Sequence, residues 1–408
     1  MNSLDVSDPN GLLTVVAERL GLTLTEWRAT HTEPARRGNQ FGFEVTLHSE
    51  ATGPQTHTIF VETDSDVDAG EGVLILEQPG TSSRIAVWVY PNDPALPALS
   101  ATVFSDSASA LLAKLGVTTQ QPKLTVLAYR PGKRAVIRVE DGSQRLYLKV
   151  VRPGRAAAIV ERHTAFLNAG VTVPRVIGWS DEGLIALTEL SGTEAQKVPV
   201  RLDDEFLEKV RELADHIATV PSAEPARESL VDRLAWYLSR LNTLQPENKA
   251  ALSRLAHGSR QLLFEGRSGT VTLVTIHGDL HAGQIFIGAS PGSTDTGLNI
   301  TELVITGLLD IDTAGLGDPA DDSAAFYAHL LVLAGHLRQA GKRDTAAHIE
   351  ALAHSWRAGW LRDGDPGFTA RARAIAATHL LGHALRQPPD GIAIILDLAE
   401  GIVFGEHA

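Results

Sequence analysis

The stretch that decides the fold is His277-Gly278-Asp279-Leu280-His281-Ala282-Gly283-Gln284, which lies between the apolar runs Val271–Ile276 and Ile285–Ile287. A loop so polar, framed by two short apolar strands, indicates a functional site on a rigid scaffold. Asp310 and Asp312 end a later apolar run, where carboxylates are good ligands for a hard cation. Phosphoryl transfer needs this inventory, with one carboxylate for the acceptor hydroxyl and oxygen ligands for magnesium.

A strand-rich lobe is expected upstream of this loop. Its single helix is predicted over Arg155–Asn168, where apolar residues recur at helical spacing before Gly170. Turn residues separate its strands, which are expected at Leu124–Tyr129, Ala135–Glu140, Arg145–Val151, Arg175–Gly178 and Leu184–Glu189. Beyond Ser191-Gly192 the pattern becomes mainly helical.

The N-terminal region predicts a separate small α+β domain. Helices are expected at Gly11–Leu20 and Ser105–Leu115. Short strands are expected at Phe43–Leu47, Thr58–Val61, Val73–Leu76 and Arg84–Tyr90. The chain would then divide into a cap domain (1–118), a nucleotide-binding lobe (119–192) and a helical lobe (193–408).

Composition excludes several classes of function. Lys and Arg number 36 against 49 Asp and Glu, and this net charge of −13 argues against a nucleic-acid or anionic-membrane partner. The absence of Cys excludes disulfides, Cys-ligated zinc, iron–sulfur clusters and a thiol nucleophile. Met1–Asn10 lacks a secretory signal pattern, and the apolar stretch Ala324–Gly335 is shorter than the roughly 20 residues that span a bilayer. We therefore expect a cytoplasmic protein without a membrane helix.

The His-x-Asp-x-x-x-x-Gln run, the later Asp-x-Asp and the segment Gly317-Asp318-Pro319-Ala320-Asp321-Asp322 resemble the small-molecule kinases of the aminoglycoside phosphotransferase, choline kinase and maltokinase group. This resemblance implies a protein-kinase-like bilobal α+β fold, with ATP and Mg²⁺ as cofactors. It implies that Asp279 is the catalytic aspartate and that Gln284 and Asp310 hold the metal, with Asp312 as a second metal ligand. Asp322 would brace the catalytic loop.

The strand lobe contains the other parts of a kinase site. Lys149 lies on the third strand and Glu161 on the following helix, matching the pair that positions nucleotide phosphates. The strand that ends at Glu189 would be the hinge that binds adenine. The turn after the first strand is not glycine-rich, so basic Lys133 and Arg134 are expected to contact phosphate.

The phosphate acceptor is the aspect of the function that the sequence determines least. Gln284 in place of asparagine, together with a cap domain, is similar to the maltokinase-like branch that includes actinobacterial glucosamine kinases. That similarity implies a sugar or amino-sugar acceptor, with glucosamine first (giving glucosamine 6-phosphate) and maltose or an aminoglycoside as alternatives. His281 and His383 are candidate acceptor contacts. A catalytically silent nucleotide-binding module is the alternative of a different class, and no oligomeric state is indicated.

Three other motifs compete with this interpretation. His277 and His281 suggest a zinc pair, but nearby carboxylates and the lack of a third His favour magnesium, and His277 is expected to fix the loop. Gly315–Ala320 fits a dinucleotide pattern, but its crowded carboxylates oppose a pyrophosphate at the helix N-terminus. Gly288–Gly292 fits a nucleophile elbow, yet Pro291 lacks the N–H that an oxyanion hole needs.

Overall fold

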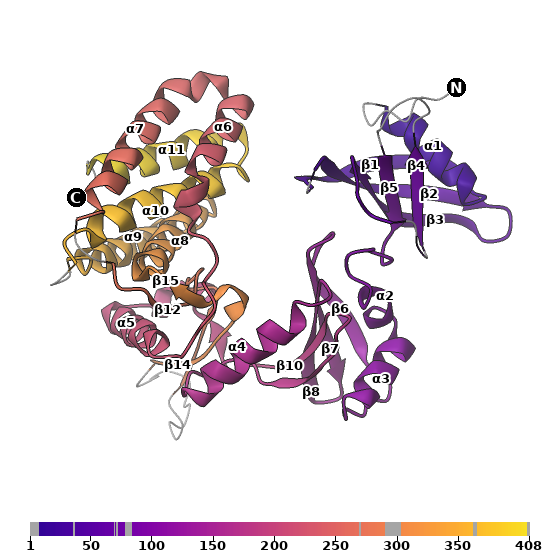
Figure 1. The fold of residues 1–408 in the computed structure, drawn as a ribbon, viewed down its shortest axis with the longest axis horizontal. Helices are drawn as coiled ribbons and strands as arrows, with labels where there is room; N and C mark the ends of the chain where they lie inside the picture. Colours follow the sequence, from indigo (N-terminus) through magenta and orange to yellow (C-terminus); the bar gives the residue numbers. More distant parts are fainter. Residues whose placement is uncertain are drawn as a thin grey trace. The chain divides into compact units, whose positions relative to one another are not determined.

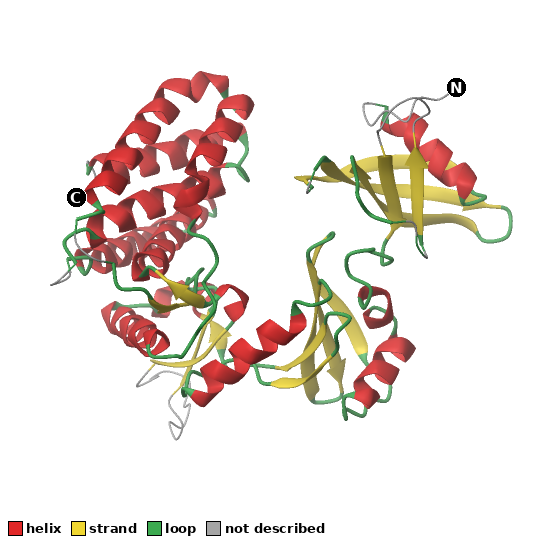
Figure 2. Ribbon diagram, in the orientation of Figure 1, coloured by secondary structure: helices red, strands yellow, loops and turns green. Residues whose placement is uncertain are grey.

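The computed structural model describes residues 8–35, 37–68, 70, 72–77, 84–268, 271–289, 303–361 and 365–405. Strands dominate the first half of the chain and helices the second, which confirms the α+β class (Figures 1 and 2). Contacts divide the chain into two compact units. The first contains Met1–Val160 and Val176–Glu189, and the second contains Glu161–Arg175 and Leu190–Ala408. None of the described helices combines the length and apolar character needed to cross a membrane.

The first unit begins with an antiparallel sheet in the order β1-β2-β3-β5-β4. Its strands are β1 (Thr23–Pro34), β2 (Asn39–Ser49), β3 (Gly53–Thr63), β4 (Val73–Glu77) and β5 (Arg84–Val89). Helix α1 (Pro9–Arg19) covers one face and buries Leu12 and Val16 against Val45 and Ile59. Strand β1 was not predicted, because an edge strand with mostly exposed, polar side chains lacks an apolar period.

The second sheet has the order β6-β7-β8-β10-β9, and the five strands predicted for this lobe are all present. Its strands are β6 (Lys123–Arg130), β7 (Arg134–Asp141), β8 (Gln144–Val151), β9 (Val176–Trp179) and β10 (Leu184–Thr188), and α4 (Ala156–Asn168) follows β8. Helices α2 (Leu99–Thr102) and α3 (Ser105–Lys114) contribute Leu99 and Leu112 to the core beneath this sheet. These helices lie inside the range assigned to the cap, and the boundary at residue 118 stays a prediction.

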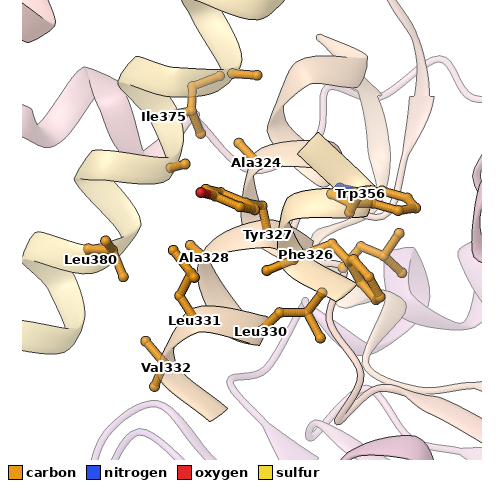
Figure 3. Close-up of a cluster of buried hydrophobic side chains, with 14 of the residues drawn as sticks. Ala324, Phe326, Tyr327, Ala328, Leu330, Leu331, Val332, Trp356, Ile375 and Leu380 are labelled. Atoms are coloured by element: carbon orange, nitrogen blue, oxygen red, sulfur yellow. The ribbon is translucent and has the colours of Figure 1, made fainter. Parts of the chain in front are cut away.

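The second unit is mainly helical. Its helices are α5 (Asp204–Ala218), α6 (Leu234–Leu244), α7 (Lys249–Glu265), α8 (Pro319–Gln339), α9 (Arg343–Ala358), α10 (Phe368–Ala384) and α11 (Pro389–Phe404). Single 3-10 turns lie at Ala195–Lys197, Pro199–Arg201, Leu230–Arg233, Pro246–Asn248 and Ile311–Thr313. Figure 3 shows the centre of the core, where Phe326 of α8 packs on Trp356 of α9, with ring centroids 4.6 Å apart. Helix α8 is buried along most of its length, which explains its apolar sequence.

Two small sheets interrupt the helices and frame the polar loop. Strands β11 (Thr193–Glu194), β13 (Ile285–Ala289) and β14 (Leu303–Leu308) form one sheet, and β12 (Val274–Ile276) pairs with β15 (Gly315–Gly317) in the other. The predicted strand at Val271–Ile276 is shorter in the structure, where it begins at Val274. The loop of residues 277–284 therefore starts at the end of β12 and ends at the start of β13.

Candidate functional site

The polar loop is anchored by Asp322, in the first turn of α8. Its carboxylate accepts the backbone N–H of His277 at 2.6 Å and that of Gly278 at 2.8 Å. Burial raises the pKa of Asp322, while the bound N–H groups and the neighbouring imidazole of His277 oppose that rise. The loop is thus fixed to a helix that is buried along most of its length.

His277 connects this loop to the segment that carries Asp310. Its Nδ1 accepts the N–H of Asp279 at 3.2 Å, so the proton of the neutral ring lies on Nε2, which donates to the Leu309 carbonyl at 2.8 Å. Gly278 has φ +83°, and a Cβ there would lie 2.7 Å from the Thr313 carbonyl oxygen. Only glycine adopts this positive φ without strain and has no Cβ to collide with Thr313.

Asp279 is held at the surface of the site with 31% of its side chain exposed. Nη2 of Arg227 lies 3.3 Å from Oδ1 of Asp279 and also donates to the Gly278 carbonyl at 2.7 Å. Burial acts to raise the pKa of Asp279, but Arg227 and then the nearby imidazoles outweigh it, and the net shift is downward. The carboxylate is therefore ionised at neutral pH and can accept a hydroxyl proton.

Gln284 and Asp310 occupy adjacent ends of the β13–β14 hairpin. The Leu309 N–H donates to the Gln284 carbonyl at 2.8 Å, next to the paired Ile285 and Leu308. Asp310 adopts the left-handed conformation, with φ 55° and ψ 43°, which is sparsely populated by residues other than glycine. The structure therefore brings together the predicted metal-binding pair, and its amide and carboxylate oxygens suit a hard cation such as Mg²⁺. Asp312 lies in the turn that follows.

Four histidines extend the site next to Asp279. His281 stacks on His329 of α8 at 4.2 Å between ring centroids, and His329 meets His383 and His379 of α10 at 4.7 and 6.0 Å. Of these four, the sequence analysis proposed His281 and His383 as acceptor contacts. The signal for the others was present, because His329 interrupts an apolar stretch and His379 precedes His383 by four residues, on the same helix face.

The three helix-borne histidines are neutral at neutral pH. Burial lowers the pKa of His379 to about 3. Burial and then Arg386 lower the pKa of His383 to about 4. Burial also holds the pKa of His329 well below its usual value. Each ring therefore offers one N–H donor and one nitrogen lone pair.

The other predicted nucleotide contacts lie on the strand lobe. Lys149 is buried on β8, whereas Glu161 is exposed on α4. The two residues fall in different compact units, so their pairing stays a prediction. The Glu189 carboxylate accepts hydrogen bonds from Arg145 at 2.8 Å and from the Tyr147 hydroxyl at 3.2 Å.

The turn expected to contact phosphate is tied to the N-terminal sheet and the segment that follows it. Asp93 accepts the Gly132 N–H at 2.6 Å, and Arg152 donates to the Gly132 carbonyl at 2.6 Å. The Lys133 ammonium forms an ion pair with Glu33 of β1. Arg134 begins β7. In this arrangement the lysine predicted to bind phosphate is held by a carboxylate of the cap.

The region that contains this site matches a known protein family. Residues 130–362 match the phosphotransferase enzyme family named APH. Among curated proteins, none matches the chain. Similar solved structures include spectinomycin phosphotransferase APH(9)-Ia in complex with ADP and spectinomycin, at 12% identity over 74% of this chain and 98% of that chain, with a TM-score of 0.48. They also include aminoglycoside phosphotransferase APH(4)-Ia, at 15% identity over 74% and 98%, with a TM-score of 0.47.

The family match covers more than half of the chain. It spans Lys149, the polar loop of residues 277–284 and Asp310, the residues on which the resemblance to small-molecule kinases was based. The protein belongs to the phosphotransferase enzyme family.

Proposed function

We propose that the protein is an ATP- and Mg²⁺-dependent kinase that phosphorylates a hydroxyl group of a sugar or amino sugar, with glucosamine as the first acceptor to test. The observation that carries this proposal is the placement of ionised Asp279 in the same unit as Gln284 and Asp310. Membership of a phosphotransferase family supports the reaction class. Glucosamine 6-phosphate and ADP would be the products.

In this reaction the chain supplies positioning and charge. Gln284 and Asp310 would hold Mg²⁺, which when bound neutralises charge on the phosphate oxygens. Asp279 accepts the proton of the acceptor hydroxyl as the new O–P bond forms and the bond from the γ-phosphorus to ADP breaks. Arg227 keeps that carboxylate ionised and oriented. Lys149, with Glu161 as its proposed partner, would contact the remaining phosphates.

The histidine cluster supports a hydroxyl-rich acceptor. A neutral imidazole both donates and accepts one hydrogen bond, as each sugar hydroxyl does. Within the described part of the chain, Nε of Arg227 is buried without a hydrogen-bond partner and is a further donor.

Phosphate transfer from radiolabelled ATP tests the proposal. The purified full chain is assayed with Mg²⁺ against glucosamine, glucose, maltose, choline and aminoglycosides. We expect the highest kcat/KM with glucosamine. Transfer only to choline or to aminoglycosides would contradict the sugar acceptor, and binding of Mg-ATP without transfer to any acceptor would favour a silent nucleotide-binding module.

The Asp279→Asn variant tests the role of the carboxylate. The amide cannot accept the hydroxyl proton in the same way, so we expect kcat to fall by at least about 100-fold, a typical contribution of a positioned base. Binding of ATP, measured by calorimetry, should be unchanged within error. A variant with the activity of the wild type would exclude this mechanism.

A further inference from the structure

We propose that Asp279, His329 and His379 form a binding site for a zinc ion, separate from the magnesium ligands. One carboxylate oxygen and one ring nitrogen of each histidine all lie within 4.8 Å of one another. The three residues come from the polar loop, α8 and α10. This proposal depends on these described residues alone and holds whichever acceptor the enzyme uses.

The spacing is close to that of a bound ion. Zinc ligands at about 2.0–2.2 Å from a tetrahedral centre are about 3.4 Å apart, so the ligand atoms need to approach by at most about 1.4 Å. Stacking on His281 fixes the plane of the His329 ring. His383 lies edge-on to His329, with ring centroids 4.7 Å apart, outside this group of three ligands. Two or three imidazoles with one carboxylate are typical of zinc sites.

The hydrogen bonding and the donor atoms of these histidines also favour a metal. His379 has only 4% of its surface exposed, and among the described residues the rings of His329, His379 and His383 make no hydrogen bond. This nitrogen-rich set differs from the oxygen donors of Gln284 and Asp310, which suit Mg²⁺.

Occupation of this site has a functional consequence that rests on the proposed function. A carboxylate oxygen of Asp279 that binds zinc cannot accept the acceptor hydroxyl proton. Zinc should therefore inhibit phosphoryl transfer competitively with the acceptor and not with ATP. The enzyme would carry an inhibitory metal site within its acceptor pocket.

Direct metal binding tests the site without any activity assay. Zinc is titrated calorimetrically into the chelator-treated full chain in excess Mg²⁺, and Co²⁺ is followed by visible absorption. We expect one zinc ion per chain and the intense Co²⁺ bands of four-coordinate geometry. The variants His329→Asn and His379→Asn should each weaken zinc binding by more than the roughly tenfold cost of losing a supporting group.

Two control variants show whether zinc binds at this site or elsewhere on the protein. His336→Asn removes an exposed histidine of the same helix and should leave zinc affinity unchanged. Asp310→Asn removes a magnesium ligand and should also leave it unchanged. His329, which is only partly buried, provides the test if the His379 variant does not fold by circular dichroism. Absence of zinc binding, unchanged binding in the folded His329 variant, or loss in the Asp310 variant would each overturn the proposal.

Discussion

At the scale of single residues, the reactivity of Asp279 depends on what surrounds it. Burial alone would favour the protonated acid, and Arg227 reverses that preference. The same guanidinium holds the backbone carbonyl of Gly278, so one side chain sets both the charge and the position of the carboxylate. Arg227 is therefore a positioning residue for the proposed base.

Replacing Arg227 should shift the pH dependence of catalysis. Without its positive charge the pKa of Asp279 rises, so the acidic limb of the kcat profile moves to higher pH in Arg227→Met. Arg227→Lys retains the positive charge, so the acidic limb of its kcat profile should return toward the pH at which the wild type has it. A purely structural role would lower kcat equally at every pH, and that result would contradict this assignment.

The buried histidines make the protein sensitive to acid. The folded-state pKa of His379 is about 3, below the roughly 6.5 of an unfolded histidine, so the unfolded chain binds more protons between these values. This difference in proton binding does not affect the free energy of unfolding above about pH 6.5. Below that pH the free energy of unfolding falls, and the loss reaches about 3 kcal/mol at pH 4 for this one residue. His379→Asn should therefore show a smaller loss of unfolding free energy from pH 7 to pH 4 than the wild type in urea titrations. Parallel pH dependences would contradict the buried neutral state.

At the scale of elements, the start of α8 organises the site. Asp318 caps the helix by accepting the Ala320 N–H, and Asp322, one turn later, holds the polar loop. Arg371 of α10 is nearly buried and bridges Asp318 to Asp365. This ion triad fixes α10, with its histidines, against the end of α8 that carries the loop anchor.

Arg371→Met should destabilise the protein strongly. The change leaves Asp318 and Asp365 without their shared cation, and breaking a buried ion pair on one side costs about 3–5 kcal/mol. The free energy of unfolding from urea titration measures the effect. Arg254→Met, which removes an exposed ion pair with Glu400, is the control and should cost about 1 kcal/mol or less.

At the scale of the whole molecule, the N-terminal sheet is connected to the nucleotide lobe through specific polar contacts. Glu33 of β1 holds Lys133, and Asp93 holds the neighbouring Gly132. A cavity of 530 Å³ lies beside these contacts, and its lining includes Trp88 of β5 and Arg152, which follows β8. In this structure Lys133 is therefore paired with a carboxylate of the N-terminal sheet.

Glu33→Gln tests whether Lys133 binds phosphate. If it does, ATP must compete with Glu33, and removing that carboxylate should lower the KM for ATP by about 1.4- to fivefold, the equivalent of an ion pair worth about 0.2–1 kcal/mol. Glu44→Gln, which removes an exposed ion pair with Arg28 on the same sheet, should leave that KM unchanged. An unchanged KM in Glu33→Gln would mean that Lys133 does not contact ATP.

The sequence by itself determined the α+β class, the five strands of the second sheet and the family, because short-range patterns carry them. The loop of residues 277–284 and the strand end at Asp310 are local motifs whose spacing is readable before folding. Strand β1 was not predicted, because its edge position leaves most of its side chains in solvent and its sequence therefore lacks an apolar period.

Only the tertiary structure decided which distant residues surround Asp279. Arg227 comes from an irregular segment, and His329 and His379 come from two helices, so no local pattern relates them to the loop. The neutral state of the histidines and the ionised state of Asp279 are likewise set by burial and neighbouring charge. Both depend on packing in three dimensions, which brings together groups up to 152 positions apart along the chain, as in the hydrogen bond from Arg162 to Ala314.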